Sequence, residues 1–170
     1  VKDQTVLPAL ATVRRAVKYP IEADIHFHYR LALGAIEAGV DGVRLNPGNV
    51  FQPREIREVV RAAKKKKIPV RVGINSGSLP ARYASRKDQP KAMADAAAAY
   101  VAIIESYGFR DIMVSLKASD VASTIRANRI FSRHSSCPLH LGVTATGLVR
   151  EGSIKSAVGI GTLLAEGIGD

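Results

Sequence analysis

Polar side chains recur at every second position along five short segments that are otherwise rich in aliphatic residues. Because side chains alternate between the two faces of a β-strand, the polar residues of each segment share one face. The opposite face is apolar, with Ile25 and Phe27 in the first segment and Val43 and Leu45 in the second. The polar positions, segment by segment, are Asp24, His26 and His28; Arg44 and Asn46; Arg71 and Asn75; Ser115, Lys117 and Ser119; and His140 and Thr144.

This polar face is unusual for parallel strands, which normally read as continuous apolar runs when helices cover both sides. Burying unpartnered polar groups costs several kcal/mol each. The side chains must therefore satisfy one another or line a solvated site. In a barrel of alternating strands and helices such a site lies at the carboxyl ends of the strands.

The charge of these residues indicates an anionic ligand. Arg44, Arg71 and Lys117 supply three cations, and Asn46 and Asn75 add amide donors. Arginine offers a planar fork to phosphate oxygens, and lysine offers a point charge. The turn that begins at Asn75 and reads NSGS up to Ser78 could add backbone N–H donors. A diphosphate fits this set of donors.

Two other interpretations remain open. His26 and His28 lie two residues apart, a spacing that barrel metallohydrolases use to bind a metal at a strand end, with Lys117 and His140 on later strands. A non-catalytic, anion-binding scaffold of enzyme-like fold is the other alternative. Gly159 and Gly161 lie inside an apolar helical pattern and indicate close helix packing more than a dinucleotide loop.

The elements that would carry these residues alternate between helix and strand. Helices are expected over residues 3–18, 29–38, from Pro53 through the Lys64–Lys67 run, 90–107, after a cap at Ser119 or Asp120, and 153–165; strands are expected over 21–27, 42–46, 69–75, 111–117 and 138–144. Strands separated by helices indicate parallel βαβ units. A complete eight-fold barrel needs about 200 residues or more, so five parallel strands in 170 residues predict a partial (β/α)8 barrel.

Composition narrows the class of protein. Of 170 residues, 46% are hydrophobic and 24% charged, with no apolar run of the roughly 20 residues that span a bilayer. The net charge of +10 favours anionic partners, although the Lys64–Lys67 run is expected to be a solvated helix end without stacking aromatics. Cys137 is the single cysteine and is expected to be a small buried residue. A cytoplasmic protein with no nucleic-acid or membrane partner is the simplest expectation; a plastid is the alternative for a plant or algal source.

Six motifs in order carry a family resemblance. They read ADIHFHY from Ala23, RLNPGN from Arg44, RVGINSGSL from Arg71, VSLKASD from Val114, HLGVT from His140 and KSAVGIG from Lys155. The chain resembles the 4-hydroxy-3-methylbut-2-enyl diphosphate synthases of the methylerythritol phosphate route to isoprenoids. The resemblance implies a barrel domain over residues 1–170 that binds 2-C-methyl-D-erythritol 2,4-cyclodiphosphate, which the enzyme reductively opens and dehydrates.

The resemblance also implies roles for single residues. Catalytic roles fall on Asp24, His26, Lys117 and His140, and substrate-binding roles on Arg44, Asn46, Arg71, Asn75, Ser78, Ser115 and Thr144. It implies a [4Fe–4S] cluster whose ligands lie outside this chain, a reduced ferredoxin or flavodoxin as electron donor, and a possible homodimer. No metal is expected on these residues.

The chain departs from the family pattern at three positions. His28 stands where the family usually has Asp, and Ser76 where it usually has Ala. The usual Thr-Glu-Ala-Gly reads TATG here, which places Ala145 at the position of the glutamate. Since the chain opens at Val1 and stops at Asp170, we expect a barrel fragment cut at both ends and separated from the iron–sulfur domain.

Overall fold

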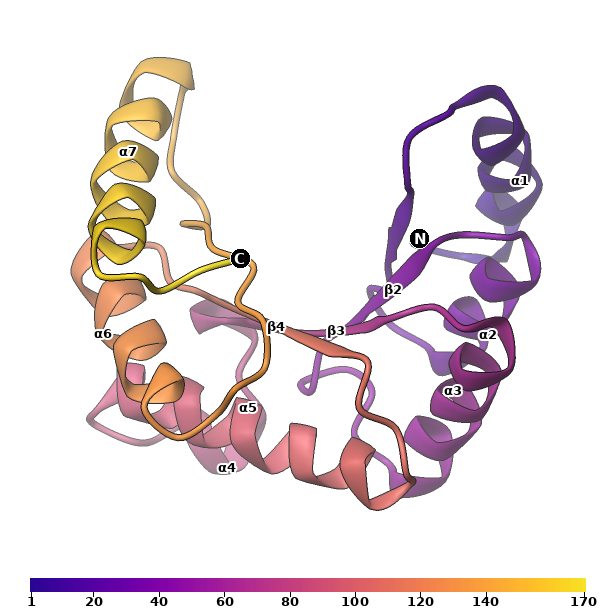
Figure 1. Ribbon diagram of the computed structural model, residues 1–170, viewed down its shortest axis with the longest axis horizontal. Coiled ribbons are helices and arrows are strands. Elements are labelled where there is room, and N and C mark those ends of the chain that lie inside the picture. The colour runs from indigo at the N-terminus through magenta and orange to yellow at the C-terminus, as the bar shows by residue number, and fades with distance from the viewer. The chain divides into compact units, whose positions relative to one another are not determined.

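Helices alternate with parallel strands throughout the computed structural model, which describes residues 1–170. The strands are neighbours in chain order, and β1 pairs with β2 and β2 with β3 in parallel. This confirms the expected α/β class. The strands are β1 (Glu22–Asp24), β2 (Gly42–Leu45), β3 (Val70–Asn75) and β4 (Ile112–Lys117). The helices, labelled in Figure 1 where there is room, are η1 (Gln4–Val6), α1 (Leu7–Ala16), α2 (Tyr29–Glu37), α3 (Pro53–Lys66), η2 (Ser76–Ser78), α4 (Ala81–Ala84), α5 (Gln89–Ser106), α6 (Val121–Ser132) and α7 (Val149–Ala165).

The chain divides into two compact units. The first comprises Val1–Val72 and Val101–Ile112, and the second comprises Gly73–Tyr100 and Met113–Asp170. Strands β3 and β4 each contribute to both units.

The first unit is built on β1, β2 and the start of β3. Helix α2 packs on both α1 and α3, and these helices cover β2 (Figure 1). The expected helical spacing of α3 is confirmed, since Ile56, Val59, Val60 and Ala63 are buried. The strand residues Val43, Leu45 and Val72 are fully buried as well. The polar faces of β1 to β3 are thereby fixed by the burial of the opposite faces.

The second unit holds the end of β3, most of β4 and the packed pair α6 and α7. Ile74, Val114 and Leu116 are fully buried strand residues, and Leu163 is their counterpart on α7. A Cβ atom on Gly159 would lie 2.9 Å from Val143 Cγ2 and 3.6 Å from Val121 Cγ1 of α6, so close packing is confirmed for this glycine, whereas Gly161 has open space around it. Asp120 caps α6 by accepting a hydrogen bond from the Ser123 N–H, which selects between the two expected caps.

The fifth expected strand, over residues 138–144, forms only an isolated parallel bridge. Leu139 pairs with Val114, and the backbone N–H groups of His140 and Thr144 donate to the carbonyls of Val114 and Ala118. The segment thus follows β4 without a continuous ladder. Four strands and this bridge take the place of the five strands expected.

Other expectations need correction. The first strand was expected to run to Phe27 but ends at Asp24, and Phe27 is 62% exposed instead of packing on a helix. The reason is that His28 already caps the next helix, α2. The segment between the expected strand 69–75 and the expected helix 90–107 contains two short helices, η2 and α4. Cys137, expected to be buried, is only partly so.

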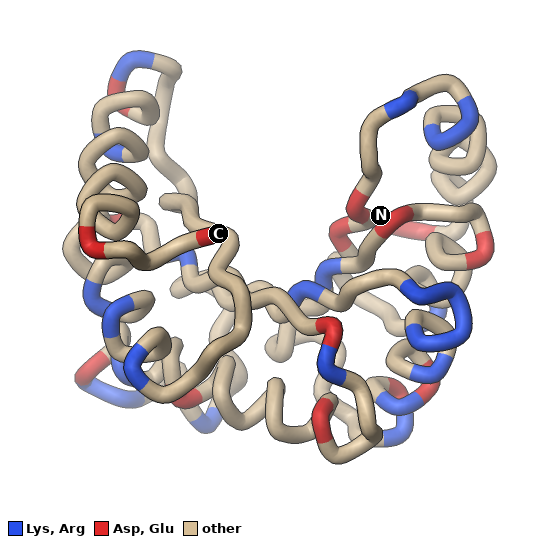
Figure 2. The backbone as a smooth tube through the Cα atoms, viewed as in Figure 1, with Lys and Arg blue, Asp and Glu red and all other residues tan.

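Charge gathers at the C-terminal end of α3, where Figure 2 shows a run of basic residues. Lys64, Lys65, Lys66 and Lys67 are all exposed, which confirms the expected solvated helix end. None of the helices has the length and apolar character that crossing a membrane would require.

Candidate functional site

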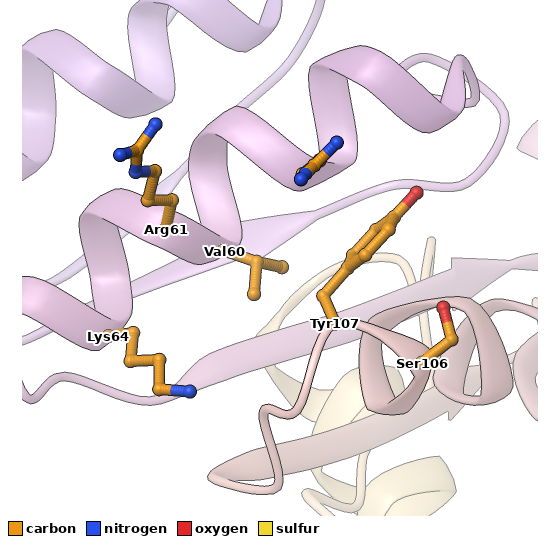
Figure 3. Close-up of a pocket in the computed structure, with 6 residues that line it drawn as sticks. Val60, Arg61, Lys64, Ser106 and Tyr107 are labelled. Carbon is orange, nitrogen blue, oxygen red and sulfur yellow. The ribbon is translucent and has the colours of Figure 1, made fainter.

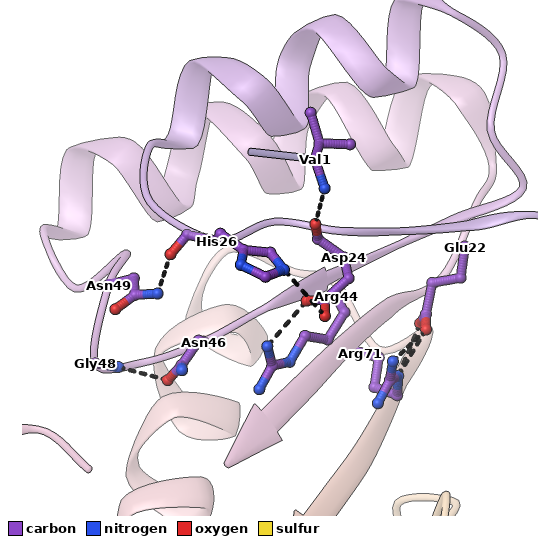
Figure 4. A network of polar contacts seen from close by, with 9 residues as sticks. All are labelled: Val1, Glu22, Asp24, His26, Arg44, Asn46, Gly48, Asn49 and Arg71. Atoms are coloured by element: carbon purple, nitrogen blue, oxygen red, sulfur yellow. Dashed lines mark hydrogen bonds and ion pairs between the residues drawn. The ribbon is translucent and has the colours of Figure 1, made fainter. Parts of the chain in front are cut away.

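Arg44 lies in the middle of the polar face of the first unit. Its side chain is only 9% exposed, and its Nη1 donates to Asp24 Oδ1 over 2.9 Å (Figure 4). The contact follows from strand register, because Asp24 and Arg44 are direct partners in the β1–β2 pairing. A guanidinium of so little exposure is held in place by this carboxylate and is screened little by solvent.

Arg71 is engaged in the same manner by a residue that the motifs do not include. Its Nε lies 2.9 and 2.8 Å from the two carboxylate oxygens of Glu22, and its Nη2 also donates to Glu22 (Figure 4). Sequence reasoning missed Glu22. The signal was present, because Glu22 lies two residues before Asp24 and therefore on the same strand face.

The two carboxylates change the electrostatics expected of this face. We call Glu22, Asp24, His26, Arg44 and Arg71 the strand-face cluster. Its two guanidiniums are balanced by two carboxylates, one for each, so the cluster is close to neutral where the sequence suggested a net positive surface. Any anion that reaches Arg44 or Arg71 meets a guanidinium already in an ion pair.

The two histidines do not share a strand face. His26 Nε2 lies 3.6 Å from Asp24 Oδ2, beyond the end of β1. His28 instead caps α2, with its Nδ1 accepting the Arg30 N–H over 3.2 Å and its ring stacked on Tyr29. The chain contains no group of three or more His, Cys, Asp or Glu side chains arranged to hold a metal ion. The strand-end imidazole pair of the metallohydrolase interpretation is therefore not formed.

Asn46 shapes the loop that follows β2. It is buried, and its Oδ1 accepts the Gly48 N–H over 2.9 Å, while Asn49 donates to the His26 carbonyl (Figure 4). This short-range bond is typical of Asn at turns. The loop after β2 is thus tied to the residues that follow β1. Arg44, Asn46, Asp24 and His26 are brought together, as the sequence predicted.

Lys117 is the cation of the second unit and lies at the end of β4. A Cβ atom on Gly142 would lie 2.9 Å from Lys117 Cε and 3.1 Å from its Nζ, so the lysine side chain runs across the face of this glycine. Ser115, which lies two residues earlier on the same face of β4, is buried. His140 and Thr144 lie two residues to either side of Gly142, and their N–H groups donate to the carbonyls of Val114 in β4 and of Ala118 just after it. These four residues are therefore neighbours within the second unit.

Helix α6 fastens the strand end that carries Lys117. Thr124 Oγ1 accepts the Ala118 N–H over 3.0 Å, and Asn128 Nδ2 donates to the Leu116 carbonyl over 3.0 Å. Both side chains are buried. Asn75 and Ser78, the other expected ligands of this unit, mark the start and end of the η2 turn, where the Asn75 side chain does not cap.

One pocket of the first unit lies away from the strand-face cluster. It has a volume of about 550 Å³ and is lined by Arg57, Val60, Arg61, Lys64, Ser106 and Tyr107 (Figure 3). Lys64 donates to the Gly108 carbonyl and Tyr107 to the Pro53 carbonyl, so these groups tie α3 to the end of α5. Arg61 points away from Tyr107 in Figure 3. We therefore do not place the substrate there.

Solved structures of low sequence identity support the fold. A deoxyribose phosphate aldolase from Aeropyrum pernix aligns with 92% of this chain and 66% of its own, with a TM-score of 0.58 at 13% identity. A type I 3-dehydroquinate dehydratase from Clostridium difficile aligns with 88% of this chain and 60% of its own, with a TM-score of 0.55 at 14% identity. At such identities the likeness concerns the fold alone.

Sequence comparison identifies the family. A 4-hydroxy-3-methylbut-2-en-1-yl diphosphate synthase (flavodoxin) from Thermodesulfovibrio yellowstonii is 51% identical over the whole chain, and the relative from Geobacter sulfurreducens is 45% identical. The chain spans about half the length of these curated relatives, 49% of each. The model of the GcpE TIM-barrel domain matches residues 1–170. This chain therefore belongs to the GcpE TIM-barrel domain family.

Proposed function

We propose that this chain is the substrate-binding barrel part of a 4-hydroxy-3-methylbut-2-enyl diphosphate synthase. The whole enzyme would reductively open and dehydrate 2-C-methyl-D-erythritol 2,4-cyclodiphosphate. The observation that carries the proposal is the 51% identity over the full chain to a synthase of that name. The low exposure of Arg44 and Arg71, on adjacent and paired strands, supports a role in holding phosphate groups.

The residues of the first unit are assigned to one part of the substrate. Arg44 and Arg71 bind phosphate oxygens through their guanidinium forks, and Asn46 adds a polar contact beside Arg44. Loss of water from the substrate requires a proton on the departing oxygen. We assign that proton to His26, whose Nε2 lies 3.6 Å from Asp24 Oδ2.

The residues of the second unit supply the remaining contacts. Lys117 contributes a point charge to a phosphate group, and Asn75, Ser78, Ser115 and Thr144 are assigned as hydrogen-bond partners. His140 is assigned as a further proton carrier because it lies two residues before Gly142, against which Lys117 runs. Each of these assignments concerns this chain's own side chains.

The residues of this chain do not fit an iron–sulfur cluster. Such clusters are held by several cysteine thiolates, and the only cysteine here is Cys137. A cluster of the whole enzyme would therefore take its ligands from other residues. For the electron donor we propose a flavodoxin, because the names of the curated relatives specify one.

Calorimetric titration of the natural full-length protein with the cyclodiphosphate tests the proposal. Arg44→Ala and Arg71→Ala should each weaken binding by about 2 kcal/mol, roughly thirty-fold, as expected for charge-assisted contacts to phosphate. Arg57→Ala is the matched control, since it removes the same charge from the outer side of α3. The proposal is wrong if the protein does not bind the cyclodiphosphate, or binds it equally well without Arg44 and Arg71.

A further inference from the structure

The ion pair of Arg71 and Glu22 crosses a strand. Glu22 belongs to β1 and Arg71 to β3, and β2 lies between them. The β2 residue in register with Glu22 is Gly42, which has no side chain on that face. A Cβ there would lie 3.7 Å from Glu22 Cγ, an ordinary van der Waals contact, so Gly42 adjoins the Glu22 side chain without obstructing it.

The contact occupies one edge of the arginine fork. Glu22 accepts from Nε and Nη2, which is the edge that also binds phosphate in a bidentate manner. The Arg71 side chain is 12% exposed and the Glu22 side chain 31% exposed, so water screens the pair only partly. A phosphate oxygen at this edge would have to replace the carboxylate or share the fork with a like charge.

Glu22 differs in this respect from Asp24. Asp24 pairs with its direct register partner, Arg44, and belongs to the first of the six motifs. Glu22 precedes that motif and reaches past its own register partner to Arg71. The ion pair of Glu22 with Arg71 therefore involves a residue that lies outside the six motifs.

We propose that Glu22 is an internal carboxylate that positions Arg71 and competes with the substrate diphosphate for its guanidinium. The inference rests on the proposed function, in which Arg71 binds phosphate. Glu22 sets the affinity of the site. It keeps Arg71 ordered and neutralised in the absence of ligand, and it lowers the free energy gained when a diphosphate binds.

Isothermal titration of the natural full-length protein, with inorganic pyrophosphate and with the cyclodiphosphate, tests this competition. Glu22→Gln keeps the size of the side chain and removes its charge, so pyrophosphate should bind roughly five- to ten-fold more tightly. Glu58→Gln is the control, because it removes one carboxylate from an Arg–Glu pair on the outer side of α3. It should change the affinity less than about two-fold.

A double-mutant cycle separates competition for Arg71 from a change in total charge. In an Arg71→Ala background, Glu22→Gln should have no effect on pyrophosphate binding. If Glu22→Gln fails to fold, Glu22→Asp, whose shorter carboxylate cannot hold the same edge of the fork, should tighten binding in its place. A Glu22 variant that binds pyrophosphate more tightly but has a lower melting temperature would support competition, because a purely structural role predicts no tighter binding.

The outcomes distinguish this inference from the proposed function. Pyrophosphate binding that depends on Arg71 but does not increase in the Glu22 variants overturns the role of Glu22 and leaves the proposed function standing. An equal increase in the Arg71→Ala background also overturns it. Binding of pyrophosphate with this pattern, but none of the cyclodiphosphate, would support the role of Glu22 and refute the proposed function.

Discussion

Gly142 is the residue whose lack of a side chain most directly places a charged group. The lysine chain of Lys117 lies within 2.9 to 3.3 Å of the position that a Cβ atom would take on Gly142. Such distances are shorter than a relaxed carbon–carbon contact. Because the atoms involved are the far end of a flexible side chain, a methyl group would move Lys117 and leave the backbone in place.

Gly142→Ala should therefore alter ligand binding more than stability. We expect the melting temperature to change little and the affinity for the cyclodiphosphate to fall by about ten-fold, because the displaced amine would no longer meet the phosphate that we propose it binds. Calorimetric titration and thermal unfolding of the same variant check both parts. Gly161→Ala, at a glycine with open space around it, is the control. An unchanged affinity would contradict the placement of Lys117.

Most of the polar residues of the first unit were predictable because strand alternation depends on sequence alone. Arg44, Asn46 and Asp24 lie where the alternation predicts them. The neutralisation of Arg71 was not predictable, because it depends on which strands are neighbours and on the register that places Gly42 opposite Glu22. Phe27 was assigned to the wrong environment because the pattern continued past the point where β1 ends.

At the scale of single elements, the end of α3 shows how a helix can stop without glycine. Lys67 adopts a left-handed conformation with φ 56° and ψ 46°. Its N–H donates to the Lys64 carbonyl, and the Ile68 N–H donates to the Ala63 carbonyl. This pair of bonds is the Schellman arrangement, in which the left-handed position is usually glycine. A lysine there carries a steric cost that glycine would not.

Lys67→Gly should stabilise the protein by about 1 kcal/mol, since the removed strain exceeds the added backbone entropy of the unfolded chain. Urea unfolding monitored by circular dichroism measures the change. Lys66→Gly serves as the comparison, because the same exchange one residue earlier lies within α3 and should destabilise by up to about 1 kcal/mol. Equal effects of the two exchanges would show that the left-handed conformation of Lys67 costs nothing.

Every expected helix forms, whereas one of the five expected strands is reduced to an isolated bridge, and the reason lies in the kind of bonds each uses. Helix α3 begins at Pro53 as expected, and α2 and α5 each end one residue before the expected bounds of 38 and 107. These signals are local. The segment over residues 138–144 has the composition of a strand but keeps only the Leu139 bridge to Val114, because a ladder depends on the geometry of its partner.

At the scale of the whole molecule, the division into two units could not be read from the chain. Its boundaries, after Val72 and Tyr100 and after Ile112, fall within strands and a helix instead of in linkers. The family was predictable because six motifs retain their order over the whole length, and the match to residues 1–170 confirms it. Charge was less informative, because the excess of basic residues includes the exposed end of α3.

Stability in acid tests the ionic contacts of both units together. In the first unit, the Ile21 N–H and then the Arg14 guanidinium hold the pKa of Asp41 below its ordinary value of 3.8. In the second, the Lys91 N–H and then Arg126 lower the pKa of Asp88. A carboxyl group with a lowered pKa in the folded state binds fewer protons there than in the unfolded chain. These groups therefore stabilise the fold above their ordinary pKa.

The free energy of unfolding should accordingly fall as the pH drops below about 4 and continue to fall until the folded carboxyls are protonated. Chemical denaturation of the wild type, Asp41→Asn and Asp88→Asn between about pH 6 and pH 2.5 measures the profile. Each variant should be less stable near neutral pH and should lose less stability on acidification. Glu37→Gln, at an exposed glutamate outside these ion pairs, corrects for the loss of one charge. If Asp41→Asn and Asp88→Asn follow the wild-type slope below pH 4, their ionic contacts do not govern stability in acid, and the basic excess of the chain alone must account for the decline.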